Sequence, residues 1–278
     1  MDLKGILENL KNQNDYGATD NVELLLAEMV ENIGHPDPEL RDHLIYTTLY
    51  HWVERDVLST DSLSKLLKVS MDDKHLFCSI GDRETDTVFT RSFSSLAAAL
   101  VIAKDARILA LPEVLIREAI ENSIRYLKEE RDTRGFVLGK GWAHSIAHGA
   151  DFLTASIKHP YFEESLIPSC LEAIANCYEK EAIYMDDEDE RLIFAIEALL
   201  GKGMTEKQLV KWLKELNHML KRQYEEKGFS IPFFRRKKNL IDFYKSLYFR
   251  LGYLKDFSSV QEEIGTLLKN WHESLYRP

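Results

Sequence analysis

The chain has 278 residues and a formal charge of −10, from 36 Lys and Arg against 46 Asp and Glu. Hydrophobic residues make up 45% and charged residues 29%, close to the averages of soluble globular proteins. With only 7 Pro and 13 Gly, the composition excludes disordered, collagen-like and low-complexity chains. The length is sufficient for one large buried core or two small ones.

Three features of the sequence indicate the cellular compartment of the protein. The N-terminal stretch MDLKGILENLKNQ is charged and lacks the apolar run of a signal peptide. The longest apolar run, Leu96–Ala103, is far shorter than the ~20 residues that a membrane span needs. Cys170 and Cys177 would lie roughly 10 Å apart along a helix, too far for a disulfide. We therefore expect a cytoplasmic protein with free thiols and no membrane span.

Apolar residues recur with the 3.6-residue period of an α-helix along almost the whole chain, and convincing strand alternation is absent. Pro38 suits a first helical turn, and Ser59 suits an N-cap. No Gly-, Pro- or Ser-rich linker interrupts the pattern, so we expect residues 1–278 to form a single all-α domain. The pattern predicts about twelve helices, over Asp2–Lys11, Asn21–Ile33, Pro38–Val57, Asp61–Met71, Asp86–Lys104, Pro112–Arg131, Lys140–Lys158, Glu163–Lys180, Asp189–Leu200, Thr205–Glu225, Pro232–Leu251 and Ser258–Tyr276.

Three stretches, TRSFSSLAAAL, WAHSIAHGADFL and DERLIFAIEALL, can be placed in register so that Arg91, His144 and Arg191 coincide. Their offsets of 53 and 47 residues are somewhat longer than the ~40–47 typical of HEAT and armadillo repeats. A helix hairpin cannot bury its apolar face alone, so neighbouring hairpins must stack. We predict an α-α superhelix, an armadillo- or HEAT-like solenoid in which Leu96–Ala103 is buried nearly all round. Chance register between amphipathic helices is the alternative.

Positive charge is concentrated near the C-terminus. Residues 221–250 hold nine Lys and Arg against three Asp and Glu, whereas residues 1–220 carry a net charge of −15. Basic and aromatic residues lie together around Arg235–Lys238, as they do on nucleic-acid-binding surfaces. We interpret the stretch as a solvated helix start instead, because the acidic remainder would repel a polyanion. Its apolar residues are then expected in the core: Phe234, Leu240, Phe243, Tyr244 and Leu247.

The stretch GKGWAHSIAHGADFL contains the strongest cluster of chemically active residues. His144, His148 and Asp151 are spaced i, i+4 and i+7, which places them within about 60° of one another on a helix. Two such histidines can ligate one metal ion, and a nearby carboxylate can ligate it or orient a ring. Hydrogen-bonded structural or ligand-contacting histidines are the alternative, since no third ligand is evident. Trp142 offers a stacking surface beside them.

Two other segments supply further candidates. Five consecutive acids at 186–190 precede an apolar helix, where the helix dipole favours negative charge. We interpret them as a solvated cap, with a cation site as the alternative. In the loop of residues 79–93, Arg91 could bind a carboxylate or phosphate as a planar fork, or pair with Asp86. Nucleophile-elbow, P-loop and dinucleotide-binding motifs are absent. The candidate ligand-binding residues are Arg91, Ser92, Trp142, His144, His148, Asp151, Asp189 and Arg191, with His144 and His148 as candidate metal ligands.

The stretch RDTRGFVLGKGWAHSIAHGADFL, with DTVFTRSFSSL before it and DDEDERLIFAI after it, resembles the Gram-positive bacterial family known as domain of unknown function 2785. The resemblance extends from about Asn21 to Leu251. It implies an all-α superhelix of the armadillo type, and it implies no particular activity. The positions that match the family signature are Arg91, Ser92, Phe93, Trp142, His144, His148, Asp151, Glu188, Asp189 and Arg191.

Two classes of function follow. In the first class, the protein is a binding scaffold that holds a peptide, a protein or a small polar or anionic ligand around His144 and His148. This class is slightly favoured, because no nucleophile–base pair is visible. As an enzyme, such as a metal-assisted hydrolase, it would use these histidines and Asp151, with a divalent metal as cofactor. An open solenoid would spread polar groups along a groove, whereas a closed toroid would gather them in one pocket. In either case, stacked repeats would bring Arg91 and Arg191 into one site with the histidines. The ligand and the oligomeric state are left open.

Overall fold

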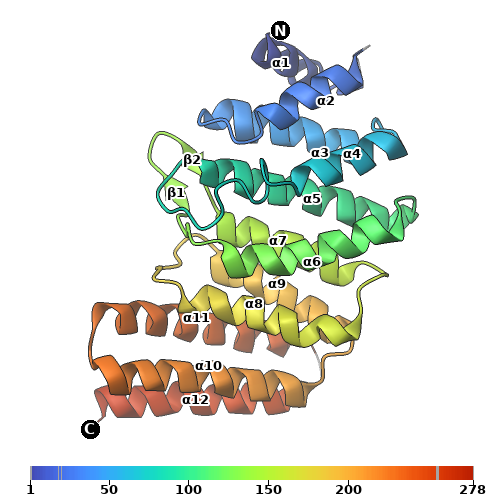
Figure 1. Cartoon of the computed structure of the whole chain (residues 1–278). Coiled ribbons are helices and arrows are strands. Elements are labelled where there is room, and N and C mark those ends of the chain that lie inside the picture. Colours follow the sequence, from blue (N-terminus) through green and yellow to red (C-terminus); the bar gives the residue numbers. More distant parts are fainter. Residues whose placement is uncertain (1, 18, 20, 255–256, 278) are drawn as a thin grey trace. The chain divides into compact units, whose positions relative to one another are not determined.

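The computed structural model describes residues 2–17, 19, 21–254 and 257–277. These residues form twelve α-helices, a π-helical segment, a short 3-10 turn and one pair of two-residue strands (Figure 1). The expected all-α class with about twelve helices is therefore confirmed. Contacts divide the chain into two compact units, Met1–Phe162 and Glu163–Pro278. The single domain over residues 1–278 that the sequence indicates therefore stays a prediction.

The first unit is organised around one long central helix, α5, which packs against α3, α4, α6 and α7. A second face of α7 is covered by α6. In chain order the elements are α1 (Leu3–Gln13), α2 (Val22–Glu31), η1 (Glu39–Tyr46), α3 (Thr47–Glu54), α4 (Thr60–Ser70), α5 (Thr87–Ile108), α6 (Glu113–Glu129), β1 (Phe136–Val137), β2 (Gly141–Trp142) and α7 (Ser145–Lys158).

The core of this unit lies along α5 and α7. A Cβ on Gly149 of α7 would lie 2.7 Å from Cε1 of Tyr126 and 2.8 Å from Cδ2 of Leu127, both on α6. This close helix crossing fixes the start of α7 against the core. As expected for the apolar run of α5, its buried residues include Leu96, Ala97, Ala98, Ala99, Val101 and Ile102.

The predicted helix over Lys140–Lys158 begins later than expected. Residues 136–142 form a β-hairpin instead, and α7 begins after it. Gly139 and Gly141 have φ angles of 76° and 77°, which glycine adopts without steric cost. A Cβ on Gly141 would also lie 2.7 Å from Cβ of Pro38. These glycines therefore form the tight turn of a hairpin, which the helical periodicity nearby did not reveal.

The second unit consists of helices joined by short loops. α9 packs against α8 and α11, and α12 packs against α10 and α11. The predicted ranges agree with the observed ones to within a few residues. In chain order the elements are η2 (Glu164–Leu166), α8 (Ile167–Glu179), α9 (Glu188–Gly201), α10 (Glu206–Lys227), α11 (Ile231–Tyr253) and α12 (Ser258–Tyr276).

One predicted core residue of α11 is on the surface. Phe234 is 46% exposed, and its neighbour Phe233 is fully buried. Successive residues of a helix are rotated by about 100°, so only one of two adjacent phenylalanines can face the core. The other four predicted positions are buried as expected: Leu240, Phe243, Tyr244 and Leu247.

All three cysteines are free thiols, as expected. Cys170 and Cys177 are buried in α8, and burial raises the pKa of the Cys177 thiol. Cys78 is half-buried, so it is the more accessible thiol. Within the described ranges, no helix has the length and apolar character needed to cross a membrane.

Candidate functional site

His144 occupies a strained backbone position immediately before α7. Its φ and ψ of 48° and 34° lie in the left-handed region, which costs a residue other than glycine roughly 1–2 kcal/mol. Its N–H donates to the carbonyl of Arg134 at 3.1 Å, and its carbonyl accepts from the N–H of His148 at 2.8 Å. These bonds hold the turn from the hairpin into α7, with the His144 ring against Trp142.

Trp142, His144 and His148 form a continuous group of rings, here called the histidine cluster. The imidazole of His144 stacks on the indole of Trp142, with 4.3 Å between centroids and 19° between planes. The ring of His148 meets that of His144 edge-on, with centroids 5.6 Å apart. Trp142 is 39% exposed, and both histidines are half-buried. The structure thus brings together three of the eight candidate residues, and a fourth, Ser92, contacts His148.

Ser92 of α5 determines which nitrogen of His148 carries the proton. The Ser92 hydroxyl donates to the carbonyl of Ala143, and its oxygen lies 2.7 Å from Nδ1 of His148. A hydroxyl has one proton, and a carbonyl oxygen can only accept. Nδ1 of His148 therefore carries a hydrogen and donates it to Ser92, so that Nε2 is the basic nitrogen of the neutral ring. Ser92 orients His148 and is not activated as a nucleophile.

The hairpin that carries Trp142 is anchored by Arg41, a residue that the sequence analysis did not single out. Arg41 lies in η1 and is fully buried. Its guanidinium donates to the carbonyl of Lys140 at 2.7 Å and lies 2.7 Å from a carboxylate oxygen of Asp42. It also stacks over the ring of Phe89, 4.3 Å from the centroid. Burial lowers the pKa of Arg41, opposed by the negative charge of Asp42.

Arg91 does not present its guanidinium to a ligand. It is fully buried, and Nε and Nη2 donate to the two carboxylate oxygens of Glu130 at 2.6 and 2.9 Å. Nη1 donates to the carbonyl of Cys78 at 2.9 Å. The alternative pairing with Asp86 is wrong, because Asp86 pairs with Lys140 at 2.7 Å. The planar fork expected from the sequence is present, and it holds the protein's own carboxylate.

A buried polar network connects this ion pair to the histidine cluster. Oε1 of Glu130 accepts the N–H of Asp132 at 2.8 Å. The carboxylate of Asp132 holds the side chain of Arg134 at 2.6 Å, and its carbonyl accepts the hydroxyl of Ser145. Since the carbonyl of Arg134 accepts the N–H of His144, the network positions the residue that precedes α7.

The N-terminus of α7 is suited to an anion. Among the described residues, no side chain caps it, and its first turn contains no acidic residue. Backbone N–H groups at a helix start and the helix dipole both favour negative charge. The imidazoles of His144 and His148 add further hydrogen-bonding groups beside it.

Of the remaining candidates, Asp151 lies on α7, which also carries His148, whereas Asp189 and Arg191 lie on α9. Asp151 lies half-buried on α7, seven residues beyond His144. Asp189 and Arg191 lie in the first turns of α9 in the second unit, so a pocket shared with the first unit stays a prediction. The three positions predicted to be equivalent lie at different distances from their helix starts, and their equivalence in stacked repeats stays a prediction. Arg91 is the fifth residue of α5 and Arg191 the fourth of α9, whereas His144 precedes α7.

The acidic run before α9 is more deeply buried than a solvated cap. Glu188 is 2% exposed, and its carboxylate accepts the N–H of Asp186 at 2.9 Å. Burial raises the pKa of Glu188 and also that of Asp189. Asp187 precedes the helix in a left-handed conformation with φ 66°. The run therefore places three acids in the first turn of α9, where the helix dipole favours them, but one of these carboxylates lies inside the protein and is not solvated as expected.

Comparison with known proteins identifies one family. The family described as "Protein of unknown function (DUF2785)" matches residues 76–249. This range contains the histidine cluster, Ser92, Arg91 and the acidic start of α9, but not Arg41. The chain has no significant match among curated proteins or solved structures.

Proposed function

The chain belongs to the DUF2785 family, and we propose that it binds a small polar, anionic ligand at the histidine cluster. The observation that carries this proposal is the strained backbone of His144. Strained residues persist where the surrounding structure over-determines them, and they are concentrated at binding and catalytic sites. Here the surrounding structure is a buried polar network that reaches the start of α7.

Each residue of the cluster has a role in this proposal. The N–H groups of the first turn of α7 bind the anionic group, and His148 donates to it from Nε2 when its ring is in the imidazolium form. Trp142 offers a flat, partly exposed face for the rest of the ligand. Ser92, Arg91 and the hairpin hold these groups in place.

One observation favours a second candidate, a metal-dependent enzyme. Histidines that ligate metals commonly donate the other ring N–H to a neighbouring acceptor, which fixes the tautomer. The bond from Nδ1 of His148 to Ser92 has this form. In this alternative Nε2 of His148 and the ring of His144 would ligate a divalent metal, with Asp151 nearby.

The finer features of the protein are also proposals. We propose that the helices stack as armadillo-like hairpins and that the protein works in the cytoplasm of a bacterium. Helices joined by short loops support the first proposal, and three free thiols support the second. The partner is expected to be a small ligand, a peptide or a protein and not a nucleic acid.

The fluorescence of Trp142 tests ligand binding directly. The other three tryptophans are buried, with Trp52 at 0% and Trp212 and Trp271 at 5% exposure. Titration with acetate, phosphate and citrate should give a saturable change in emission in the wild type. His148→Ala should abolish it, and Trp142→Phe should remove the signal while calorimetry still detects binding.

Parallel titrations with Zn²⁺ and Ni²⁺ separate the two candidates. Metal binding that is lost in both His144→Ala and His148→Ala would favour the enzyme. No response to any anion or metal, together with a large fall in Tm for His148→Ala, would show that the cluster is a structural network only.

A further inference from the structure

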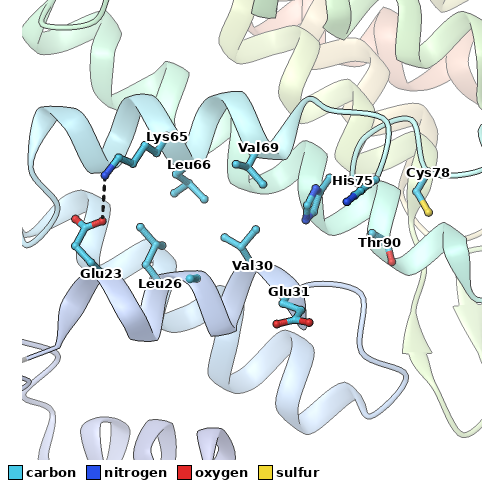
Figure 2. Close-up of a pocket in the computed structure, with 12 residues that line it drawn as sticks. Glu23, Leu26, Val30, Glu31, Lys65, Leu66, Val69, His75, Cys78 and Thr90 are labelled. Atoms are coloured by element: carbon cyan, nitrogen blue, oxygen red, sulfur yellow. Dashed lines mark ion pairs between the residues drawn. The ribbon is translucent and has the colours of Figure 1, made fainter. Parts of the chain in front are cut away.

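A cavity lies in the first unit, between α2 and α4, and shares no lining residue with the histidine cluster. Its volume is about 630 Å³, within the range of small-molecule sites. α2 contributes residues 23, 26, 27, 30 and 31, which lie on one face over about 12 Å of helix. α4 contributes residues 65, 66 and 69 from the opposite wall (Figure 2).

The middle of this cavity is apolar. Leu26 and Val30 of α2 lie opposite Leu66 and Val69 of α4, as Figure 2 shows. One end is closed by Glu23 and Lys65, whose charged groups lie 3.8 Å apart and neutralise each other. This wall favours an aliphatic or aromatic group of the ligand.

The other end of the cavity is polar and contains charges of both signs. Glu31, Lys74, His75 and Thr90 line it, together with the thiol of Cys78 (Figure 2 labels all but Lys74). Within the described part of the chain, neither the carboxylate of Glu31 nor the ammonium of Lys74 makes a hydrogen bond or ion pair. This end therefore presents one unpaired negative and one unpaired positive group.

Hydrogen bonds hold the backbone and the ring of His75 at the polar end. Oδ1 of Asp72 lies 2.7 Å from Nδ1 of His75 and accepts the N–H of Lys74 at 2.8 Å. The carbonyl of Cys78 accepts from the buried guanidinium of Arg91 at 2.9 Å.

We propose that this cavity binds a small zwitterion with an apolar side chain, the class of free apolar amino acids and short apolar peptides. Glu31 pairs with the ligand's ammonium group, Lys74 pairs with its carboxylate, and the wall between α2 and α4 takes the side chain. A ligand with a single charge would satisfy one group and be repelled by the other. A ligand without an apolar group would leave the wall in contact with water.

The rate at which Cys78 reacts with a thiol reagent measures occupancy of the cavity. Cys170 and Cys177 are both 0% exposed, so Cys78 should react first. Leucine and leucyl-leucine should slow its alkylation in a saturable way. Glycine should bind at least about tenfold more weakly than leucine, because it buries no side chain.

Two analogues of leucine test the charges. 4-Methylpentanoate lacks the ammonium group and 3-methylbutylamine lacks the carboxylate, and each should bind about two- to fivefold more weakly than leucine, as expected for losing one exposed ion pair. Equal or tighter binding of either analogue would overturn the zwitterion assignment. Failure of leucine and leucyl-leucine to protect Cys78 at any soluble concentration would overturn the proposal.

Substitutions locate the binding. Ala27→Phe places a ring in the cavity from an exposed position of α2 and should abolish protection, whereas Leu24→Phe, on α2 outside the lining, should not. Glu31→Gln should remove the preference for leucine over 4-methylpentanoate, and Lys74→Gln the preference over 3-methylbutylamine. Lys68→Gln is the matched control. Protection that survives Ala27→Phe would place the ligand elsewhere and contradict the proposal.

Discussion

Two helices of this protein begin from a left-handed residue, and they treat their N-terminal dipoles in opposite ways. α9 follows Asp187 and has three acids in its first turn, one of which is buried. α7 follows His144 and has no acid there among the described residues, but two imidazoles and a partly exposed indole beside it.

The two helix starts differ in whether the protein itself supplies the negative charge that the helix dipole favours. At α9 the protein supplies the negative charge itself, and burial of Glu188 raises the pKa of that carboxyl. At α7 the first turn contains no acid, and we propose that an external anion supplies the negative charge. The same element of secondary structure thus begins with acids of its own in one region and is a candidate binding site in the other.

The largest effect is expected from breaking the ion pair that supports α7. Arg91→Met leaves the carboxylate of Glu130 buried without its partner, which should cost about 3–5 kcal/mol. Tm should fall by roughly 6–20 °C in a thermal melt. The polar network should loosen, so the response of Trp142 to anions should also disappear.

Arg107→Met is the matched control, since its ion pair with Glu54 lies on the surface and should contribute less than about 1 kcal/mol. Adding Glu130→Met to Arg91→Met should recover part of the lost stability, because no charge then remains buried. A fall in Tm no larger than that of the control would show that the buried pair does not support the site.

A smaller loss is expected at Ser92. Ser92→Ala removes the acceptor for Nδ1 of His148, which should cost about 1–3 kcal/mol and weaken anion binding because the ring is no longer oriented. Scanning calorimetry measures the loss of stability, and titration calorimetry measures the anion binding. Ser123→Ala removes a buried hydroxyl that bonds only locally to Ile120. If both variants bind anions like the wild type, Ser92 has no role in orienting the site.

At α9 a substitution is expected to raise the stability of the protein and not to lower it. In the pH interval between the unfolded and the raised folded pKa of Glu188, the folded protein keeps a proton that the unfolded chain releases, so stability falls as pH rises. Glu188→Gln should therefore raise Tm near pH 7 and leave it unchanged below about pH 4. Glu226→Gln, on the surface of α10, should have no effect at either pH. A Glu188→Gln variant that is less stable near pH 7 would contradict this.

Substitutions in the basic stretch Arg235–Lys238 are expected to have no effect on nucleic-acid binding. Neutralising Arg235, Arg236, Lys237 and Lys238 should not change nucleic-acid binding, because the intact protein should show none at physiological salt. Fluorescence anisotropy with labelled DNA and RNA measures this. Salt-sensitive submicromolar binding that is lost in the variant would overturn the prediction.

Most of the fold could be predicted because its signals are local. Helical periodicity gave the twelve helices, and Ser59 caps α4 as expected by accepting the N–H of Ser62. The hairpin at 136–142 was missed because its strands are only two residues long, too short for any alternation. The π-helical η1 was missed because one extra residue in a turn leaves no clear trace in the periodicity.

Contacts within the site could be predicted only between residues close in sequence, although Ser92 was itself a candidate. The i, i+4 spacing placed His144 and His148 together, as observed. The partners that support them come from distant segments: Ser92 lies 56 residues from His148, and Glu130 lies 39 residues from Arg91. Spacing within one helix carries no information about such pairs, because tertiary packing creates them.

The most direct test of the central claim compares the two helix starts in one experiment. In two-dimensional ¹⁵N NMR, titration with phosphate or acetate should shift the backbone amides of Ile146 and Ala147 in the first turn of α7, with saturation, together with the imidazole of His148. The amides of Asp189 and Glu190 in α9 should not move, because acids already occupy that turn. Equal shifts at both helices, or shifts at α9 alone, would contradict the account.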